Sequence, residues 1–210
     1  MIVMPSNNSG AVCCELFRRF PGRLAHLQSA DSLRVPKFGL NWSLDNGVFG
    51  AFTKGKEWDE TNFYAWLEAH SSRRPDWVVV PDSVGNAQKT IHMWNEHAPR
   101  VRSFGNPVAF VAQDGMTREN IPTINPPDIL FVGGTTEWKW KSLPHWCASF
   151  PRVHVGRVNT ERLLWMAHRA GAESADGTGF FRGDQKQLDG IIRYLEQSTA
   201  GQRPQLELSL

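Results

Sequence analysis

The chain has 210 residues, of which 40% are hydrophobic and 21% charged, and its formal net charge is +2. This composition is typical of one globular domain and excludes a disordered chain, and the nearly neutral charge gives no general argument for nucleic-acid binding. No apolar run approaches the roughly 20 residues of a membrane span, so we expect no membrane partner. Three cysteines are too few for a disulfide framework, and the first residues lack the pattern of a secretion signal. We therefore expect a protein of a reducing compartment, the cytoplasm.

Short apolar runs alternate with helical patterns along the chain. The apolar runs predict strands at 2–4, 24–29, 39–45, 77–82, 108–113, 129–133, 153–158 and 173–178. Apolar residues at helical spacing, with polar caps, predict helices at 11–19, 59–70, 85–97, 137–149, 160–170 and 184–197. The helix at 137–149 contains Pro144 and is expected to be broken there.

Alternating strands and helices are typical of parallel βα units. Roughly eight units predict an α/β fold, a compact single-domain (β/α)8 barrel covering residues 1–197. An open, doubly wound sheet is the alternative. Residues 198–210 are expected to form a flexible tail.

Polar residues and glycines stand where the predicted strands end. They are Asp45, Asp82 and Ser83, Gln113 and Asp114, Gly133 and Gly134, Gly156 and Arg157, and Asp176. An aspartate after a strand is more often a turn residue than a catalyst, and Asp114 is assigned that role. In a parallel barrel, however, all these ends meet on one rim. Two carboxylates facing one small ligand would let one act as nucleophile and the other as proton donor or acceptor.

The order of these motifs resembles that of the guanine transglycosylases. The match runs from about residue 40 to residue 178 and is most similar to the small DpdA-type DNA 7-deazaguanine transglycosylases of phages and bacteria. The stretches that carry it are LDNGVFGAF, VVPDSVG, FVAQDG, FVGG and VHVGRVNTERLLWMAHRAGAESADGTGF.

The resemblance implies roles for the strand-end residues. It puts Asp176 in the place of the nucleophile and Asp45 in that of the acid/base aspartate. It implies a base-binding pocket formed by Asp82, Ser83, Gln113, Gly133, Gly134 and Phe49. The implied reaction exchanges guanine in DNA for a free 7-deazaguanine, such as 7-cyano-7-deazaguanine, in a bacterial or phage-infected cell. The cysteine-rich zinc subdomain of the tRNA enzymes has no counterpart here, so we expect neither structural zinc nor a cofactor.

Several alternatives remain open. Water could resolve the covalent intermediate, which would make the protein a base-excising glycosidase, or the substrate could be RNA instead of DNA. A non-catalytic nucleic-acid-binding subunit and a barrel enzyme acting on a small phosphate ester are the other possibilities.

Nucleic-acid contacts are expected from basic and aromatic residues near the rim. The candidates are Trp138, Lys139, Lys141, Arg157 and Arg182. The stretch EWKWK, residues 137–141, could equally be a surface turn whose lysines extend over packed tryptophans. His26, His92 and His154 have no partners at metal-ligand spacing and are assigned no function.

Overall fold

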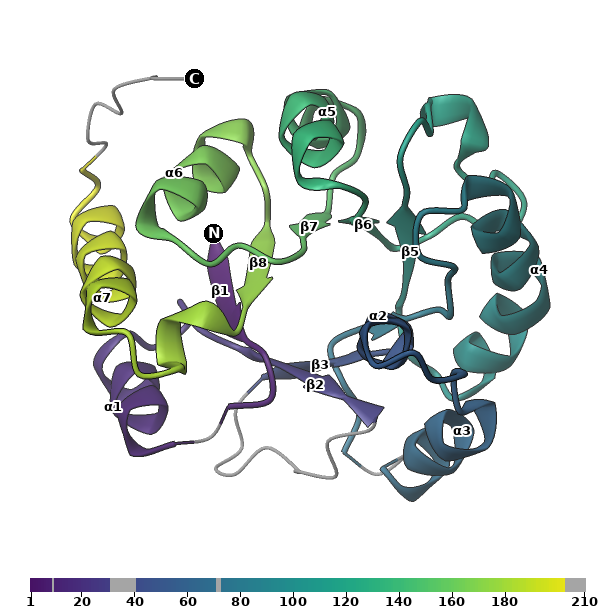
Figure 1. Ribbon diagram of the computed structural model, residues 1–210, viewed down its shortest axis with the longest axis horizontal. Helices are drawn as coiled ribbons and strands as arrows, with labels where there is room; N and C mark the ends of the chain where they lie inside the picture. Colours follow the sequence, from purple (N-terminus) through teal and green to yellow (C-terminus); the bar gives the residue numbers. More distant parts are fainter. Residues whose placement is uncertain (9, 31–40, 71–72, 203–210) are drawn as a thin grey trace.

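The computed structural model describes residues 1–8, 10–30, 41–70 and 73–202. Its eight strands form one all-parallel sheet with the order β1-β8-β7-β6-β5-β4-β3-β2 (Figure 1). The strands are β1 (Ile2–Pro5), β2 (His26–Ser29), β3 (Trp42–Asp45), β4 (Val78–Val79), β5 (Val108–Ala112), β6 (Ile129–Val132), β7 (Val153–Val155) and β8 (Ser174–Gly177).

The sheet curls until its two edge strands meet, so the barrel is nearly closed. Isolated parallel bridges join Val3 to Leu24 and Ser6 to Leu27. Asn7 continues this seam, because its backbone N–H donates to the Leu27 carbonyl at 3.0 Å and its side-chain oxygen accepts from the Ser29 N–H at 2.8 Å. Backbone groups of the edge strands are thereby paired with each other rather than with another chain.

Most helices surround the strands on the outside of the ring, and the short helix after β3 lies inside them, at the mouth of the barrel (Figure 1). The helices are α1 (Ala11–Arg19), α2 (Val48–Thr53), α3 (Glu60–Ala69), α4 (Ala87–Ser103), α5 (Thr136–Ser149), α6 (Glu161–Ala170) and α7 (Gln185–Thr199), with short 3-10 turns η2 (Arg118–Asn120) and η3 (Gly179–Phe181). The fold is a single (β/α)8 barrel of the TIM type, as predicted. Among the described residues, no helix combines the length and apolar character that a membrane crossing requires.

The predicted elements are found, but four helices differ, the strand predicted at 77–82 is only Val78–Val79, and residues 39–40 of the strand predicted at 39–45 lie outside the described residues. Helix α2 was not predicted, because its six residues are too few to establish a helical period. Helix α5 continues through Pro144, and α4 contains Pro99 and runs past its predicted end at residue 97. The lost backbone hydrogen bond is offset by packing, since Leu143 and Trp146 of α5 are buried. Helix α7 reaches Thr199, within the predicted tail, and residues 203–210 lie outside the described residues.

Strand side chains alternate between two cores. Those that point outward pack with the helices in the larger core. Those that point inward fill the barrel, with Met4, Ala25, Leu27, Trp77, Val79, Ala109, Val111 and Ile129 as the buried inner cluster. This period of two fixes which residues near each strand end face the barrel axis.

A tight contact between two strand ends gives a test of the rim. A Cβ at Gly177 would overlap the Val158 carbonyl oxygen and lie 2.8 Å from the Asn159 side-chain oxygen. We expect Gly177→Ala to lower the free energy of unfolding by about 2 kcal/mol or more in urea titrations, because backbone must shift. Gly10→Ala, whose nearest contact would be 3.4 Å, is the control and should cost less than about 1 kcal/mol. Equal costs for the two variants would contradict this packing.

Candidate active site

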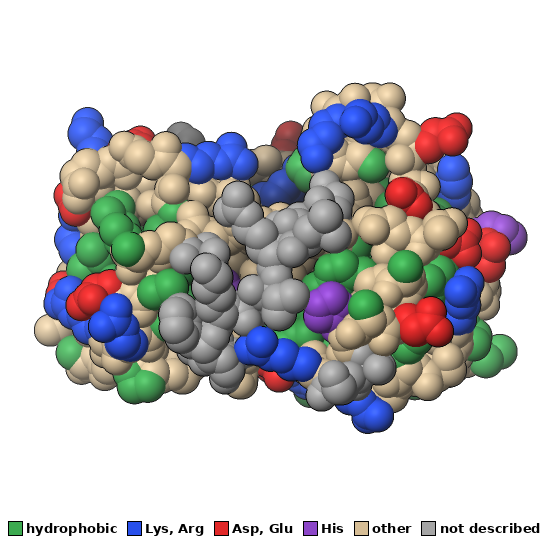
Figure 2. Space-filling model, turned by 90° about the horizontal axis from the view of Figure 1, so that it is seen from below, with side chains coloured by type: hydrophobic (Ala, Val, Ile, Leu, Met, Phe, Trp, Pro, Cys, Tyr) green, Lys and Arg blue, Asp and Glu red, His purple; other side chains and the backbone are tan. Residues whose placement is uncertain are grey.

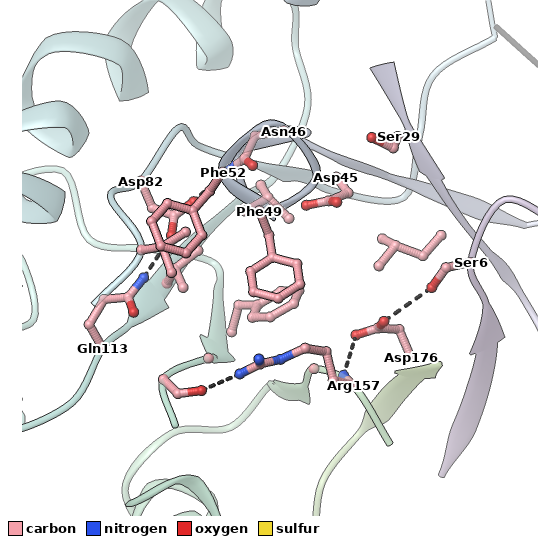
Figure 3. A pocket seen from close by; sticks show the side chains of 18 of the residues that line it. Ser6, Ser29, Asp45, Asn46, Phe49, Phe52, Asp82, Gln113, Arg157 and Asp176 are labelled. Carbon is pink, nitrogen blue, oxygen red and sulfur yellow. Dashed lines mark hydrogen bonds between the residues drawn. The ribbon is translucent and has the colours of Figure 1, made fainter. Parts of the chain in front are cut away.

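A cavity of about 330 Å³ opens at the carboxyl ends of the strands (Figure 3). Its floor is apolar and comes from inward-facing residues of the barrel, including Leu27, Val79 and Val111. Its walls carry most of the residues predicted for the site: Asp45, Phe49, Asp82, Gln113, Gly133, Gly134, Arg157 and Asp176. The size is at the lower end of the range of about 300–1,000 Å³ for small-molecule sites.

Asp176 lies on β8 and is held by three hydrogen-bond donors. Its Oδ1 accepts from the backbone N–H of Arg157 at 3.2 Å and lies 3.1 Å from Nε2 of His154. Its Oδ2 accepts from the Ser6 hydroxyl at 3.1 Å. Residues from β1, β7 and the turn after β7 thus fix this carboxylate, which is about nine-tenths buried but reaches the cavity. These contacts fix the orientation of the carboxylate at the cavity, as a nucleophile requires.

Asp45 is the last residue of β3 and projects into the same cavity from another side of the barrel (Figure 3). It pairs in register with Ser29 of β2, and both residues line the cavity. The two carboxylates predicted to act together therefore share one cavity, although 131 positions separate Asp45 from Asp176 in the sequence.

Asp82 is buried between two side-chain amides. Its Oδ1 accepts from Asn46 Nδ2 at 2.8 Å and its Oδ2 from Gln113 Nε2 at 2.7 Å. The Gln113 oxygen in turn accepts from the Gly85 N–H at 3.2 Å, which fixes the orientation of the amide. Burial raises the pKa of Asp82 to about 6, while the hydrogen bonds from Asn46 and Gln113 act in the opposite direction.

The glycine pair and Ser83 differ in their access to the cavity. Gly133 and Gly134 line it, and Gly134 has φ +68°, a left-handed conformation that favours glycine. Ser83 is not among the lining residues. Its backbone N–H and carbonyl both pair with the Thr90 hydroxyl, at 3.0 and 3.1 Å, so it is directed toward α4.

The cavity mouth combines aromatic rings with one cation. Phe49 and Phe52 of α2 are 41% and 60% exposed there. The Arg157 guanidinium lies 4.8 Å from the centre of the Phe49 ring and donates to the Gly134 carbonyl (Figure 3). Arg157 has φ +61°, which is uncommon for a residue with a side chain and directs its N–H at Asp176.

Only some of the residues predicted to contact nucleic acid lie at the surface. Lys139 is 1% exposed and its ammonium donates to the Gly156 carbonyl, so the prediction that it holds a phosphate is wrong. Burial lowers the pKa of Lys139 to about 8, an effect that the Arg157 charge reinforces and Asp176 opposes. Trp138 is half-buried against the core, whereas Lys141 and Arg182 are exposed and lie outside the cavity lining. On the face in Figure 2, basic and acidic side chains are scattered and form no single basic patch.

Sequence analysis gave no role to several residues of the site. Among them, Ser6 and Asn46 follow the ends of β1 and β3, and Phe52 lies in the short helix α2, where no periodic pattern marks them. His154 on β7 could have been found, because it stands two positions before Gly156, which follows the strand, and so shares its inward face. Asp114, predicted as a turn residue, accepts from the Thr135 N–H at 2.8 Å before α5, and also lines the cavity.

The charges of the lining define the ligands that it suits. Four aspartates, Asp45, Asp82, Asp114 and Asp176, line the cavity, with Arg157 as the one cation among the lining residues. Such a surface favours a ligand rich in N–H donors or a centre that develops positive charge, and it disfavours an anion. Within the described residues, no group of three or more His, Cys, Asp or Glu side chains is arranged to hold a metal ion.

Comparison with protein-family models gives no match to this chain, and a search of curated proteins finds no significant relative.

The buried Asp82 gives a pH-dependent prediction. Its pKa is about 6 in the folded protein against an ordinary value of 3.8, so the folded state binds more protons between these pH values. Stability should therefore fall as pH rises from about 4 to 6, by up to about 3 kcal/mol from this group. We expect Asp82→Asn to lack this component when wild type and variant are unfolded in urea across that range. The same dependence of the unfolding free energy on pH in both proteins would contradict the raised pKa of Asp82.

Proposed function

We propose that the protein is a base-exchanging glycosyltransferase that replaces guanine in DNA with a 7-deazaguanine base. The observation that carries the proposal is that Asp45 and Asp176 enter one cavity beside the Asp82–Gln113 pair. A carboxylate nucleophile, a second carboxylate for proton transfer and a polar pocket for a base are the parts that such an exchange requires.

The reaction proposed is a double displacement at the anomeric carbon of the nucleotide. The Asp176 carboxylate forms a bond to C1′ as the bond from C1′ to guanine N9 breaks, which gives a sugar ester. Asp45 donates a proton to the leaving base. The incoming 7-deazaguanine then loses a proton to Asp45 and attacks C1′, and Asp176 leaves as the carboxylate. Both steps pass through an oxocarbenium-like state, as in retaining glycosidases, and the acidic lining favours its positive charge.

Recognition of the base is assigned to Asp82, Gln113 and the glycine pair. One oxygen of Asp82 accepts from Asn46 and the other from Gln113. Each oxygen keeps a second lone pair that can accept another hydrogen bond. The N1–H and amino group of guanine are donors of the kind that would pair there. Backbone groups of Gly133 and Gly134 would meet the base carbonyl. A buried polar pocket rejects bases without matching groups, because its own groups would be left unpaired.

The target nucleotide must leave its stack, because the cavity suits one base with its sugar and not a duplex. Phe49 and Phe52 offer exposed rings on which bases can stack. Arg157 at the mouth, with the exposed Lys141 and Arg182, would contact phosphates.

The residues that line the cavity also bear on the alternative functions. An enzyme for small phosphate esters is disfavoured, because an anion would face four aspartates. A non-catalytic subunit would have no use for the donors that hold Asp176. Base excision by water and base exchange on RNA would use the same residues of the site. The experiment below distinguishes both from base exchange on DNA.

Incubation with guanine-containing DNA and 7-cyano-7-deazaguanine, followed by mass analysis of the nucleosides, tests the proposal. Wild type is expected to incorporate the deazaguanine, and Asp176→Asn to reduce incorporation below detection, because an amide is a poor nucleophile. Asp59→Asn is the matched control, since Asp59 is an exposed N-cap of α3 and Asn caps equally well. Abasic sites without incorporation would indicate excision. In a parallel incubation with RNA of the same sequence, incorporation into RNA and not into DNA would indicate the RNA enzyme. Incorporation by Asp176→Asn would remove Asp176 from the mechanism.

Asp45 should affect proton transfer and leave binding intact. We expect Asp45→Asn to slow exchange by about 10²–10⁴-fold with little change in the affinity for DNA. Single-turnover rates and a binding titration on the same preparation measure both quantities. A loss that appears only in affinity would assign Asp45 to substrate binding instead.

A further inference from the structure

His154 is a buried polar residue to which the proposed reaction has so far given no role. It lies on β7 inside the barrel with no exposed surface. The ring centres of Trp77 and Phe131 lie 5.0 and 4.6 Å from its own. Its Nδ1 is 2.8 Å from the Ser174 hydroxyl, and its Nε2 is 3.1 Å from Oδ1 of Asp176. Packing on both sides and hydrogen bonds at both nitrogens hold the ring in one orientation.

The two hydrogen-bond partners of His154 define which ring nitrogen faces the carboxylate. An ionised carboxylate only accepts hydrogen bonds, so Nε2 carries the proton that faces Asp176. The Ser174 hydroxyl meets the other ring nitrogen, Nδ1, so both nitrogens have a partner. Ser174 and Asp176 are on the same face of β8, two positions apart, so one strand supplies both partners of His154.

The two oxygens of Asp176 are held in different ways. Oδ1 faces two N–H groups that cannot turn away, the packed ring of His154 and the backbone of Arg157. Oδ2 is contacted by the Ser6 hydroxyl, which rotates about a single bond and can release it. Oδ2 is therefore the oxygen that a substrate can reach.

We propose that Asp176 attacks the sugar through Oδ2, and that His154 is a positioning residue which holds Oδ1 throughout the exchange. The inference rests on the proposed function. In the first step Oδ2 bonds to C1′, the base leaves with the N9 electron pair, and Oδ1 becomes the ester carbonyl oxygen. In the second step the C1′–Oδ2 bond breaks and its electron pair returns to the carboxylate. The N–H groups of His154 and Arg157 then stabilise the charge that reappears on Oδ1.

The two steps should respond differently when the Nε2–H group is removed. Loss of a hydrogen bond to a charged group costs about 1.5–3 kcal/mol, or roughly 10- to 150-fold. We expect His154→Met to slow breakdown of the ester by about that factor, so that the ester accumulates, while ester formation slows less. His154→Gln, whose amide can donate toward Oδ1, should restore part of the breakdown rate. Rapid acid quench of single turnovers, with the ester counted by intact-protein mass, measures both steps.

A second buried histidine provides the control. His97 lies 2.9 Å from the Tyr64 hydroxyl and is not among the residues lining the cavity. His97→Gln should leave the ratio of the two rates at the wild-type value. Equal slowing of both steps in His154→Met, with no recovery in His154→Gln, would reduce His154 to a packing residue and overturn the proposal.

Nitrogen NMR of the wild-type protein tests the arrangement without relying on activity, and therefore serves if His154→Met does not fold. The His154 signals are expected to show a proton on Nε2, the nitrogen that faces Asp176. A ring without a proton on Nε2 would overturn the proposal even if base exchange is observed. Absence of any ester in a correctly protonated wild-type protein would instead overturn the proposed function, and the role of His154 with it.

Discussion

Closure of a parallel sheet is the constraint on which the site depends. Each strand alternates its side chains between the helices and the barrel axis, and the β1–β2 seam brings the first and last parts of the sheet together. Ser6 can reach Asp176 because β1 pairs with β8, with Met4 opposite Asp176. Asp45 enters the same cavity because the curl carries β3 around to a different wall. A flat sheet in the same strand order would separate Asp45 on β3 from Asp176 on β8.

Burial sets the electrostatics of the cavity. Desolvation raises the pKa of Asp82 and lowers that of Lys139, so the charged form of each costs free energy near the rim. Lys139 uses its ammonium on the Gly156 carbonyl, next to the left-handed Arg157 whose N–H meets Asp176. One consequence is that the turn after β7 is fixed by a side chain of α5. Fixed donors around a reactive carboxylate need no reorganisation during the reaction, which is the physical basis of preorganised catalysis.

The sequence was sufficient to predict the rim and every strand and helix except α2, and insufficient to predict the direction of individual side chains. Strand ends could be found because apolar runs stop at polar residues, and a barrel brings those ends together. Lys139 was assigned to the surface because a lysine between two tryptophans suggests an exposed turn, whereas helix α5 directs it inward toward Gly156. His154 received no role because its partners, Ser174 and Asp176, lie 20 and 22 positions away. Such contacts follow from register between strands, which local patterns do not encode.

Direct detection of the sugar ester tests the central claim, that Asp176 is a nucleophile facing one nucleotide in this cavity. The protein would be mixed with guanine-containing DNA in the absence of a replacement base, quenched in acid and digested. Peptide mass spectrometry would then locate any added nucleotide. The account predicts the adduct on the peptide that contains Asp176, and on no other acidic residue of the lining. An adduct on Asp45, or turnover with no adduct in any peptide, would contradict it.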